Sequence, residues 1–224
     1  MGKELNSNFD VDVMDGESLV SNLPVVEDVD THTFLVDLSV VPTKYDVIVV
    51  VTASYGEGDP PKNFARLFLA LLTCAAHGHR PLHGLQHAVL GQGSSVYEQT
   101  FQNVPRLTDR YFGECGSRRF LMRQEIDAAD YLEGDQDQKD RASFREALFK
   151  ALQSGLSVNA PPVCSWEEAR ASHKFPIANV VPRTPADLEK SFNVGTAGKH
   201  DDQAIGTGVW VLIIAAALLY ASSG

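Results

Sequence analysis

The chain has 224 residues, of which 44% are hydrophobic, and a formal net charge of −10. This length supports one domain of roughly 150 residues with further chain beside it, but it leaves no room for two full domains. Nucleic-acid binding is disfavoured, because phosphate contacts need clustered lysines and arginines. An acidic balance suits ordinary solubility and also docking to basic partners.

Cysteines and histidines do not indicate a metal site or a disulfide framework. The cysteines are odd in number, lack CxxC spacing and fit a reducing compartment. Several histidines, His87 among them, follow one another near Gly78 and Pro81. We interpret them as exposed loop residues, since no carboxylate or cysteine completes a ligand set.

The amino-terminal part contains one clear strand pattern. Residues 9–15 alternate apolar and acidic side chains, which is typical of a half-exposed edge strand. Residues 3–6 before them resemble the last turn of a helix. Residues 33–41 are mostly apolar and form a further candidate strand.

The clearest strand lies at residues 47–51, which are all β-branched. Such a run predicts a strand buried on both faces in a parallel sheet. A loop with Gly56 and Gly58 follows, then two prolines that can open a helix, and then a helical apolar stripe at residues 63–77. Ligands bind at the carboxyl ends of strands in open α/β sheets, so Tyr55 in this loop is a candidate contact.

A second strand, at residues 86–90, also runs into a glycine loop that ends in a tyrosine, Tyr97. A helix is expected over residues 97–114, with a kink at Pro105. An acidic segment after residue 127 precedes a closing helix at residues 142–152. The repeated order of strand, glycine loop and helix predicts an open α/β sheet.

Three motifs together resemble the flavodoxin-like FMN domain of the diflavin reductases, the family of cytochrome P450 reductase, sulfite reductase and methionine synthase reductase. The first two motifs are Ser54-Tyr55-Gly56-Glu57-Gly58-Asp59-Pro60-Pro61 and Gly91-Gln92-Gly93-Ser94-Ser95-Val96-Tyr97-Glu98. The third is Arg119-Phe120-Leu121-Met122-Arg123-Gln124-Glu125-Ile126-Asp127, which looks like the family's last strand and its acidic loop. The resemblance covers residues 9–152 and implies a flavodoxin-like, doubly wound α/β fold with a parallel sheet and FMN as the cofactor.

The resemblance also implies roles for single residues. Tyr55 and Tyr97 would pack on the two faces of the flavin ring, and the backbone around Gly56 would reorient when the flavin N5 gains a proton. The FMN-binding residues implied are Ser54, Tyr55, Gly56, Glu57, Gly58, Gly91, Gln92, Gly93, Ser94, Tyr97 and Asp127. No catalytic side chain and no metal ligand is expected.

One part of the family pattern is not found upstream of Tyr55: the first strand and the hydroxyl-rich loop around the FMN phosphate. In the flavodoxin strand order 2-1-3-4-5, that strand lies between residues 9–14 and residues 47–51. Its absence predicts an N-terminally incomplete sheet with two unpaired edges. Three explanations stay open: the chain begins at an internal Met, the domain is degenerate, or residues 33–41 supply a replacement strand.

The carboxyl-terminal third divides into a tether and an apolar run. Residues 153–203 lose periodicity and contain several prolines, so we expect an extended tether after a domain at residues 1–152. Residues 204–221 are uncharged, and as a helix they would reach about 27 Å, enough for a thin bilayer. We expect a C-terminal transmembrane helix there, with the domain on the cytosolic face and the endoplasmic reticulum favoured over the mitochondrial outer membrane.

These features lead to an expected function. The resemblance implies a tail-anchored FMN-binding electron-transfer module, an oxidoreductase-type electron carrier and not a complete NADPH reductase. It would accept electrons from a separate NADPH/FAD-dependent reductase and pass them one at a time to a haem or iron–sulfur protein. The alternative is a truncated or degenerate domain with weak or no flavin binding that serves as a membrane-tethered interaction module.

Overall fold

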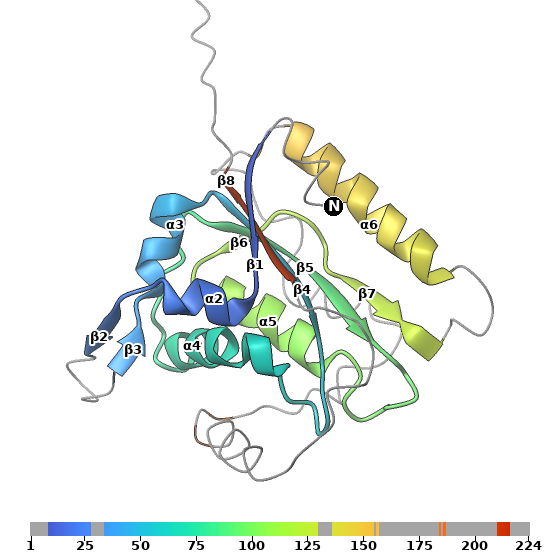
Figure 1. Cartoon of the computed structure of the whole chain (residues 1–224), viewed down its shortest axis with the longest axis horizontal. Coiled ribbons are helices and arrows are strands. Elements are labelled where there is room, and N and C mark those ends of the chain that lie inside the picture. The colour runs from blue at the N-terminus through green and yellow to red at the C-terminus, as the bar shows by residue number, and fades with distance from the viewer. Residues whose placement is uncertain are drawn as a thin grey trace, which may run out of the picture.

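The computed structural model describes residues 9–27, 34–129, 136–154, 156, 184 and 186, together with the backbone of a strand at 210–215. These residues form a three-layer α/β fold, with a six-stranded sheet between two helical layers and a separate two-stranded sheet beside it (Figure 1). The α/β architecture expected from the sequence is therefore confirmed.

The large sheet has the order β1-β8-β4-β5-β6, and β7 also pairs with β5. β4 and β5 are parallel over their whole paired length, from Val47 opposite Gln86 to Ala53 opposite Gln92. β6 and β7 continue the parallel arrangement on the far side of β5. The strands are β1 (Asp10–Met14), β4 (Val47–Ala53), β5 (Gln86–Gly93), β6 (Arg118–Arg119), β7 (Gln124–Asp127) and β8 (Trp210–Ala215).

Helices cover both faces of this sheet. In Figure 1, α2, α4 and α5 lie on one face, and the long α6 lies apart from them on the other. The helical segments are α2 (Gly16–Ser21), η1 (Leu38–Val40), α3 (Val41–Lys44), η2 (Lys62–Phe64), α4 (Ala65–Ala76), α5 (Asn103–Glu114) and α6 (Gln136–Gln153). The small sheet pairs β2 (Val25–Glu27) with β3 (Phe34–Val36).

The alternation of side chains along β4 explains why two apolar cores form. Ile48 and Val50 point to the core that contains the buried residues of α4 and α5. Val47, Val49 and Val51 point to the opposite core, where they meet apolar residues of α6 such as Phe144. A run of β-branched residues is therefore buried on both faces, as the sequence predicted.

Three helix and strand boundaries differ from the expected ones. α5 begins at Asn103 and not at residue 97, because Gln102 adopts the left-handed conformation with a φ of 58°. Pro105 then falls in the first turn of the helix, where no intrahelical N–H bond is needed. The expected strand at 119–127 is divided into β6 and β7, and α6 begins six residues before the predicted residue 142.

The position of the missing strand is occupied by β8, which lies between β1 and β4 and runs antiparallel to both. The edge strand at residues 9–15 is confirmed as β1, but the expected transmembrane helix is not what the described backbone shows at 210–215. A strand satisfies the facing N–H and C=O groups of β1 and β4, which would otherwise be unpaired edges. No helix among the described residues is long and apolar enough to cross a membrane.

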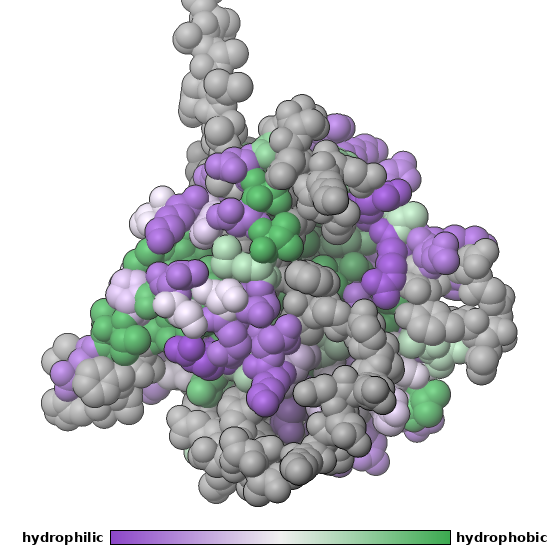
Figure 2. Space-filling model, in the orientation of Figure 1, coloured by the Kyte–Doolittle hydropathy of each residue, from purple (hydrophilic) through white to green (hydrophobic). Residues whose placement is uncertain are grey.

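Residues 33–41 do not supply the replacement strand. Phe34–Val36 pairs with β2 in the small sheet, and the chain then forms η1 and α3. The Asp37 carboxylate accepts a hydrogen bond from the Ser39 backbone N–H at 3.0 Å, which starts the η1 turn instead of a strand. Figure 2 shows apolar side chains at this small sheet, where Val25 and Val26 are exposed. The predictions for residues 3–6 and for most of 153–203 lie outside the described residues.

Candidate functional site

The predicted site residues gather at one edge of the large sheet. β4, β5 and β7 are parallel, so the loops after Ala53, Gly93 and Asp127 leave the sheet at the same edge. This edge is where an open α/β sheet binds ligands. The structure therefore brings together the three segments that the sequence assigned to one site.

The first loop is a tight turn closed by the backbone of Tyr55 and Asp59. The Tyr55 N–H donates to Asp59 O at 2.8 Å, and the Asp59 N–H donates to Tyr55 O at 2.8 Å. Gly56 and Gly58 have φ angles of 49° and 92°, which disfavour residues with a side chain. The turn leaves the Tyr55 side chain 62% exposed beside the exposed Glu57.

The second loop follows β5, whose last residues are Gly91, Gln92 and Gly93. Asp127 fixes this loop, because one carboxylate oxygen accepts from the Ser95 N–H at 2.8 Å and from the Ala129 N–H at 3.0 Å. The Tyr97 N–H donates to Ser94 O at 3.0 Å, which turns the chain so that the Tyr97 side chain is 69% exposed. Asp127 thus acts on the second loop as well as ending β7.

Gly91 and Gly93 are required by close packing and not by backbone angles. A Cβ atom on Gly91 would lie 2.0 Å from Gln102 Oε1 and 2.8 Å from Pro105 Cβ. A Cβ atom on Gly93 would lie 3.2 Å from Gln102 Nε2. The start of α5 therefore packs directly against the end of β5, which leaves no room for a Cβ atom at Gly91 and little room for one at Gly93.

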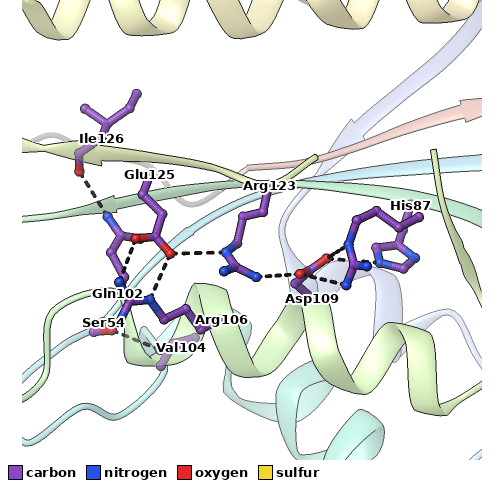
Figure 3. A network of polar contacts seen from close by, with 10 residues as sticks. Ser54, His87, Gln102, Val104, Arg106, Asp109, Arg123, Glu125 and Ile126 are labelled. Atoms are coloured by element: carbon purple, nitrogen blue, oxygen red, sulfur yellow. Dashed lines mark hydrogen bonds and ion pairs between the residues drawn. The ribbon is translucent and has the colours of Figure 1, made fainter. Parts of the chain in front are cut away.

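The sequence did not predict the role of this start of α5, which also contacts the first loop and strand β7. The Val104 N–H donates to Ser54 Oγ at 3.0 Å, and Gln102 Nε2 donates to Ile126 O at 3.0 Å (Figure 3). Asn103 Nδ2 donates to Gly58 O at 2.9 Å. The signal in the sequence was the polar pair Gln102-Asn103 at the start of an amphipathic helix, a position where side chains often bond to backbone groups.

A buried network of charges continues along α5 beneath the loops (Figure 3). Arg106 binds both carboxylate oxygens of Glu125, at 2.8 and 2.7 Å. Asp109 accepts from Arg119 Nε at 2.7 Å and from Arg123 Nη1, while Arg123 Nε also reaches Glu125 at 3.2 Å. Bidentate arginine–carboxylate pairs such as these fix α5 to β6 and β7 in a set orientation.

His87 belongs to this network, which corrects its interpretation as an exposed loop residue. Its side chain is fully buried in β5 and stacks on Phe112 with ring centroids 5.3 Å apart. Its Nε2 lies 3.3 Å from Asp109 Oδ1 and its Nδ1 lies 2.9 Å from Ser117 Oγ. His77, His79 and His83 are exposed, as expected.

Burial and charge shift the pKa values in opposite directions in this network. Burial lowers the pKa of His87, and this effect outweighs the neighbouring Asp109 carboxylate. Burial alone would raise the pKa of Asp109, but the hydrogen bonds from His87 and Arg119 and the charge of Arg123 hold that pKa well below its ordinary value. The network at neutral pH therefore contains a neutral His87 and an ionised Asp109.

The edge of the sheet fits a flat aromatic ring. Two exposed tyrosines stand on adjacent loops, and aromatic faces hold a planar heterocycle without the need for charge. Backbone groups of the glycine loops can approach such a ring closely. The loops also carry serine hydroxyl groups, at Ser54, Ser94 and Ser95.

Comparison with known proteins gives a family match and several relatives. Residues 16–146 match the family model described as Flavodoxin. The bifunctional cytochrome P450/NADPH–P450 reductase 1 of Bacillus subtilis is 36% identical over 117 residues, which cover 52% of this chain and 11% of that protein. The sulfite reductase [NADPH] flavoprotein alpha-component of Sodalis glossinidius is 30% identical over 115 residues, covering 51% of this chain and 17% of that protein.

Among solved structures, a flavodoxin from Pseudomonas aeruginosa has 28% sequence identity and a TM-score of 0.38. The match covers 48% of this chain and 67% of the flavodoxin. The chain thus spans less than a fifth of the length of the two reductases that it matches.

Proposed function

Because the chain belongs to the flavodoxin family, we propose that it is an FMN-binding electron carrier. Its cofactor is FMN, which supplies one-electron chemistry when bound. The proposed donor is a separate NADPH/FAD-dependent reductase, and the proposed acceptor is a haem or iron–sulfur protein. The names of two relatives support this direction of electron flow, since one is a bifunctional cytochrome P450/NADPH–P450 reductase and the other is the flavoprotein component of an NADPH sulfite reductase.

One observation carries the proposal: Tyr55 and Tyr97 are exposed on two loops at the ligand-binding edge. A large aromatic side chain that is more than half exposed gains apolar contact when a ring covers it. The turn at Tyr55–Asp59 and the bond from Ser95 to Asp127 hold the two loops in place before any ligand binds. The chain's own residues therefore orient the ring and exclude water from its faces.

The formal net charge of −10 suits the proposed partners. A negative surface attracts positively charged patches on redox partners and accelerates their encounter. Such steering weakens as salt screens the charges over about 10 Å. Electron transfer to the proposed acceptor is therefore expected to slow as ionic strength rises.

The proposal is tested by titrating the full chain with FMN and, in parallel, with riboflavin, while the visible absorption and flavin fluorescence are recorded. The full chain is needed because β8 is part of the sheet. We expect saturable binding of FMN that Tyr97→Ala weakens. A chain that changes neither flavin's spectrum would favour the alternative, an interaction module without a flavin.

We also propose that residues 204–221 can anchor the chain to a membrane, with the domain on the cytosolic side and the endoplasmic reticulum as the favoured membrane. The support is the uncharged sequence of this run. Strand β8 lies within it, so the same residues cannot complete the sheet and span a bilayer at once.

Flotation of the full chain with phosphatidylcholine vesicles distinguishes these two states. Membrane anchoring predicts that the chain floats with the vesicles and resists carbonate, and that Ile213→Arg releases it, because a charge at the bilayer centre costs about 2.5–3.5 kcal/mol. If the parent chain stays in the aqueous fraction, the membrane-anchor proposal is wrong, and the role of residues 204–221 is to supply strand β8.

A further inference from the structure

Asn103, the first residue of α5, joins the two tyrosine loops through a continuous chain of hydrogen bonds. Its backbone N–H donates to Thr100 O at 3.1 Å, and the Thr100 N–H donates to Tyr97 O at 3.0 Å. Its side-chain Nδ2 donates to Gly58 O at 2.9 Å, and the Gly58 N–H donates to Tyr55 O at 3.0 Å. The carbonyl groups of Tyr97 and Tyr55 are thereby linked through one asparagine.

This link lies in the interior of the protein. Asn103 is 0% exposed, and the helix that carries it is fixed by the Arg106–Glu125 pair one turn later. Breaking a buried hydrogen bond costs more free energy than breaking an exposed one, since water cannot replace the missing donor. The position of Gly58 relative to α5 is therefore set by the protein and not by the ligand.

The two glycines of the first loop differ in how closely they are held. A Cβ atom on Gly56 would meet nothing within 4 Å, whereas a Cβ atom on Gly58 would lie 3.0 Å from Asn103 Nδ2. The loop therefore has free space around Gly56, whereas at Gly58 it contacts α5 and is held there by the Asn103 hydrogen bond.

We propose that Asn103 is a positioning residue that sets the separation of Tyr55 and Tyr97, and with it the width of the slot for a flat heteroaromatic ring. The inference rests on the proposed function, because the ring it concerns is the flavin's. Asn103 acts through Gly58 and Thr100, so it affects the binding of the flavin ring and not the binding of the FMN phosphate. Its loss is expected to weaken FMN and riboflavin binding by the same factor.

The test uses the full chain with Asn103→Asp, which keeps the size of the side chain but replaces the donating amide with a carboxylate that can only accept. An acidic residue is compatible with the first turn of a helix, so α5 should still form. Asn22→Asp is the matched control, because Asn22 Nδ2 also donates to a backbone carbonyl, Ser18 O, at 2.9 Å, but on the surface. Asn103→Ala serves as a second variant.

Titrations with FMN and with riboflavin give the first readout. We expect Asn103→Asp to raise both dissociation constants about tenfold, which corresponds to about 1.4 kcal/mol, with their ratio unchanged. Asn22→Asp should bind both flavins like the parent chain. If Asn103→Asp and Asn103→Ala bind both flavins as tightly as the parent, or if only FMN binding weakens, the inference is wrong.

Amide hydrogen exchange without flavin gives a second readout that separates this inference from the proposed function. The amides of Gly58 and Asp59 should exchange faster in Asn103→Asp than in the parent and the Asn22→Asp control, while the amides of β4 should not change. Unchanged exchange at Gly58 and Asp59 would overturn the inference. If the parent binds neither flavin, the proposed function fails, and the exchange result alone decides the role of Asn103.

Discussion

The two sides of β4 are built in different ways. On one side, β4 pairs with β5 in parallel, and β5, β6, β7 and α5 make up what we call the β5 half of the sheet. On the other side, β4 pairs antiparallel with β8, which also pairs with β1, and these two strands make up the β1–β8 half. The β5 half contains the candidate site and the buried charges.

The difference between the halves shows what each depends on. In the β5 half, strand, loop and helix follow one another in sequence, and polar side chains of α5 lock the loops to the strands. In the β1–β8 half, backbone pairing joins segments from opposite parts of the chain. Specific side-chain contacts maintain the first half, and strand pairing maintains the second.

The largest expected effect comes from breaking the charge network of the β5 half with Asp109→Asn. The substitution removes a carboxylate that accepts from both Arg119 and Arg123 in the interior, and we expect the free energy of unfolding to fall by about 3–5 kcal/mol. Chemical denaturation measures this change. Glu114→Gln is the control, since its 2.7 Å bond to Arg110 is exposed and should contribute less than about 1 kcal/mol. An equal fall in the free energy of unfolding in the two variants would show that burial does not make the Asp109 ion pairs more important for stability than an exposed pair.

A somewhat smaller effect is expected from Leu212→Pro, which tests the β1–β8 half. Leu212 pairs with Val13 on one side and Val49 on the other, and proline cannot donate a backbone hydrogen bond in a central strand. We expect a loss of about 3 kcal/mol in the free energy of unfolding. Proline at Ser222, outside β8, should have no comparable effect. An unchanged denaturation midpoint in Leu212→Pro would mean that β8 contributes nothing to the sheet in solution.

The packing between β5 and α5 is tested by Gly91→Ala, which is expected to cost about 1–3 kcal/mol of stability. The new Cβ would lie 2.0 Å from Gln102 Oε1, so the start of α5 must move. Gly113→Ala, in α5, is the comparison, because a Cβ atom there meets nothing within 4 Å. This substitution should raise the stability by about 0.5–1 kcal/mol. Thermal unfolding of both variants measures the contrast, and the same sign of change in both would contradict it.

The smallest effect concerns the pH dependence of stability. Burial lowers the pKa of His87 in the folded chain, so the unfolded chain takes up its proton first as pH falls below about 6.5. Stability should therefore decrease between about pH 7 and pH 5, by at most about 1.4 kcal/mol per pH unit from this group. His87→Gln should flatten this part of the curve of unfolding free energy against pH. The exposed His83→Gln should leave the curve like that of the parent.

The sequence predicted the β5 half well because its signals are local. Five β-branched residues can only be buried on both sides, and each glycine loop follows its strand directly. The same reasoning failed for residues 210–215, since an uncharged apolar run satisfies either a bilayer or the middle of a sheet. Whether residues 210–215 form a strand depends on the unpaired edges of β1 and β4, which the periodicity of this segment does not reveal.

The buried charges were missed for a related reason. Asp109, Arg119 and Arg123 lie on three different segments, and each alone is typical of an exposed residue. Their common burial depends on how α5 crosses β6 and β7. The tyrosines at 55 and 97 were found from motif positions, but the asparagine that links their loops was not, because its partner is a backbone carbonyl 45 positions away.

The place of β8 in the sheet also determines when the sheet can be completed during synthesis. Asp10 pairs with Ala215, about 200 positions later, so this contact has one of the largest sequence separations that the chain allows. The β5 half has both of its apolar faces covered once residues 47–153, which include α6, have left the ribosome, and the gap between β1 and β4 is then still open. We therefore expect two phases of refolding, a faster one for the β5 half and a slower one for insertion of β8. Between the two phases, the edges of β1 and β4 that β8 later covers can pair with other chains, so we expect aggregation to be fastest in this interval.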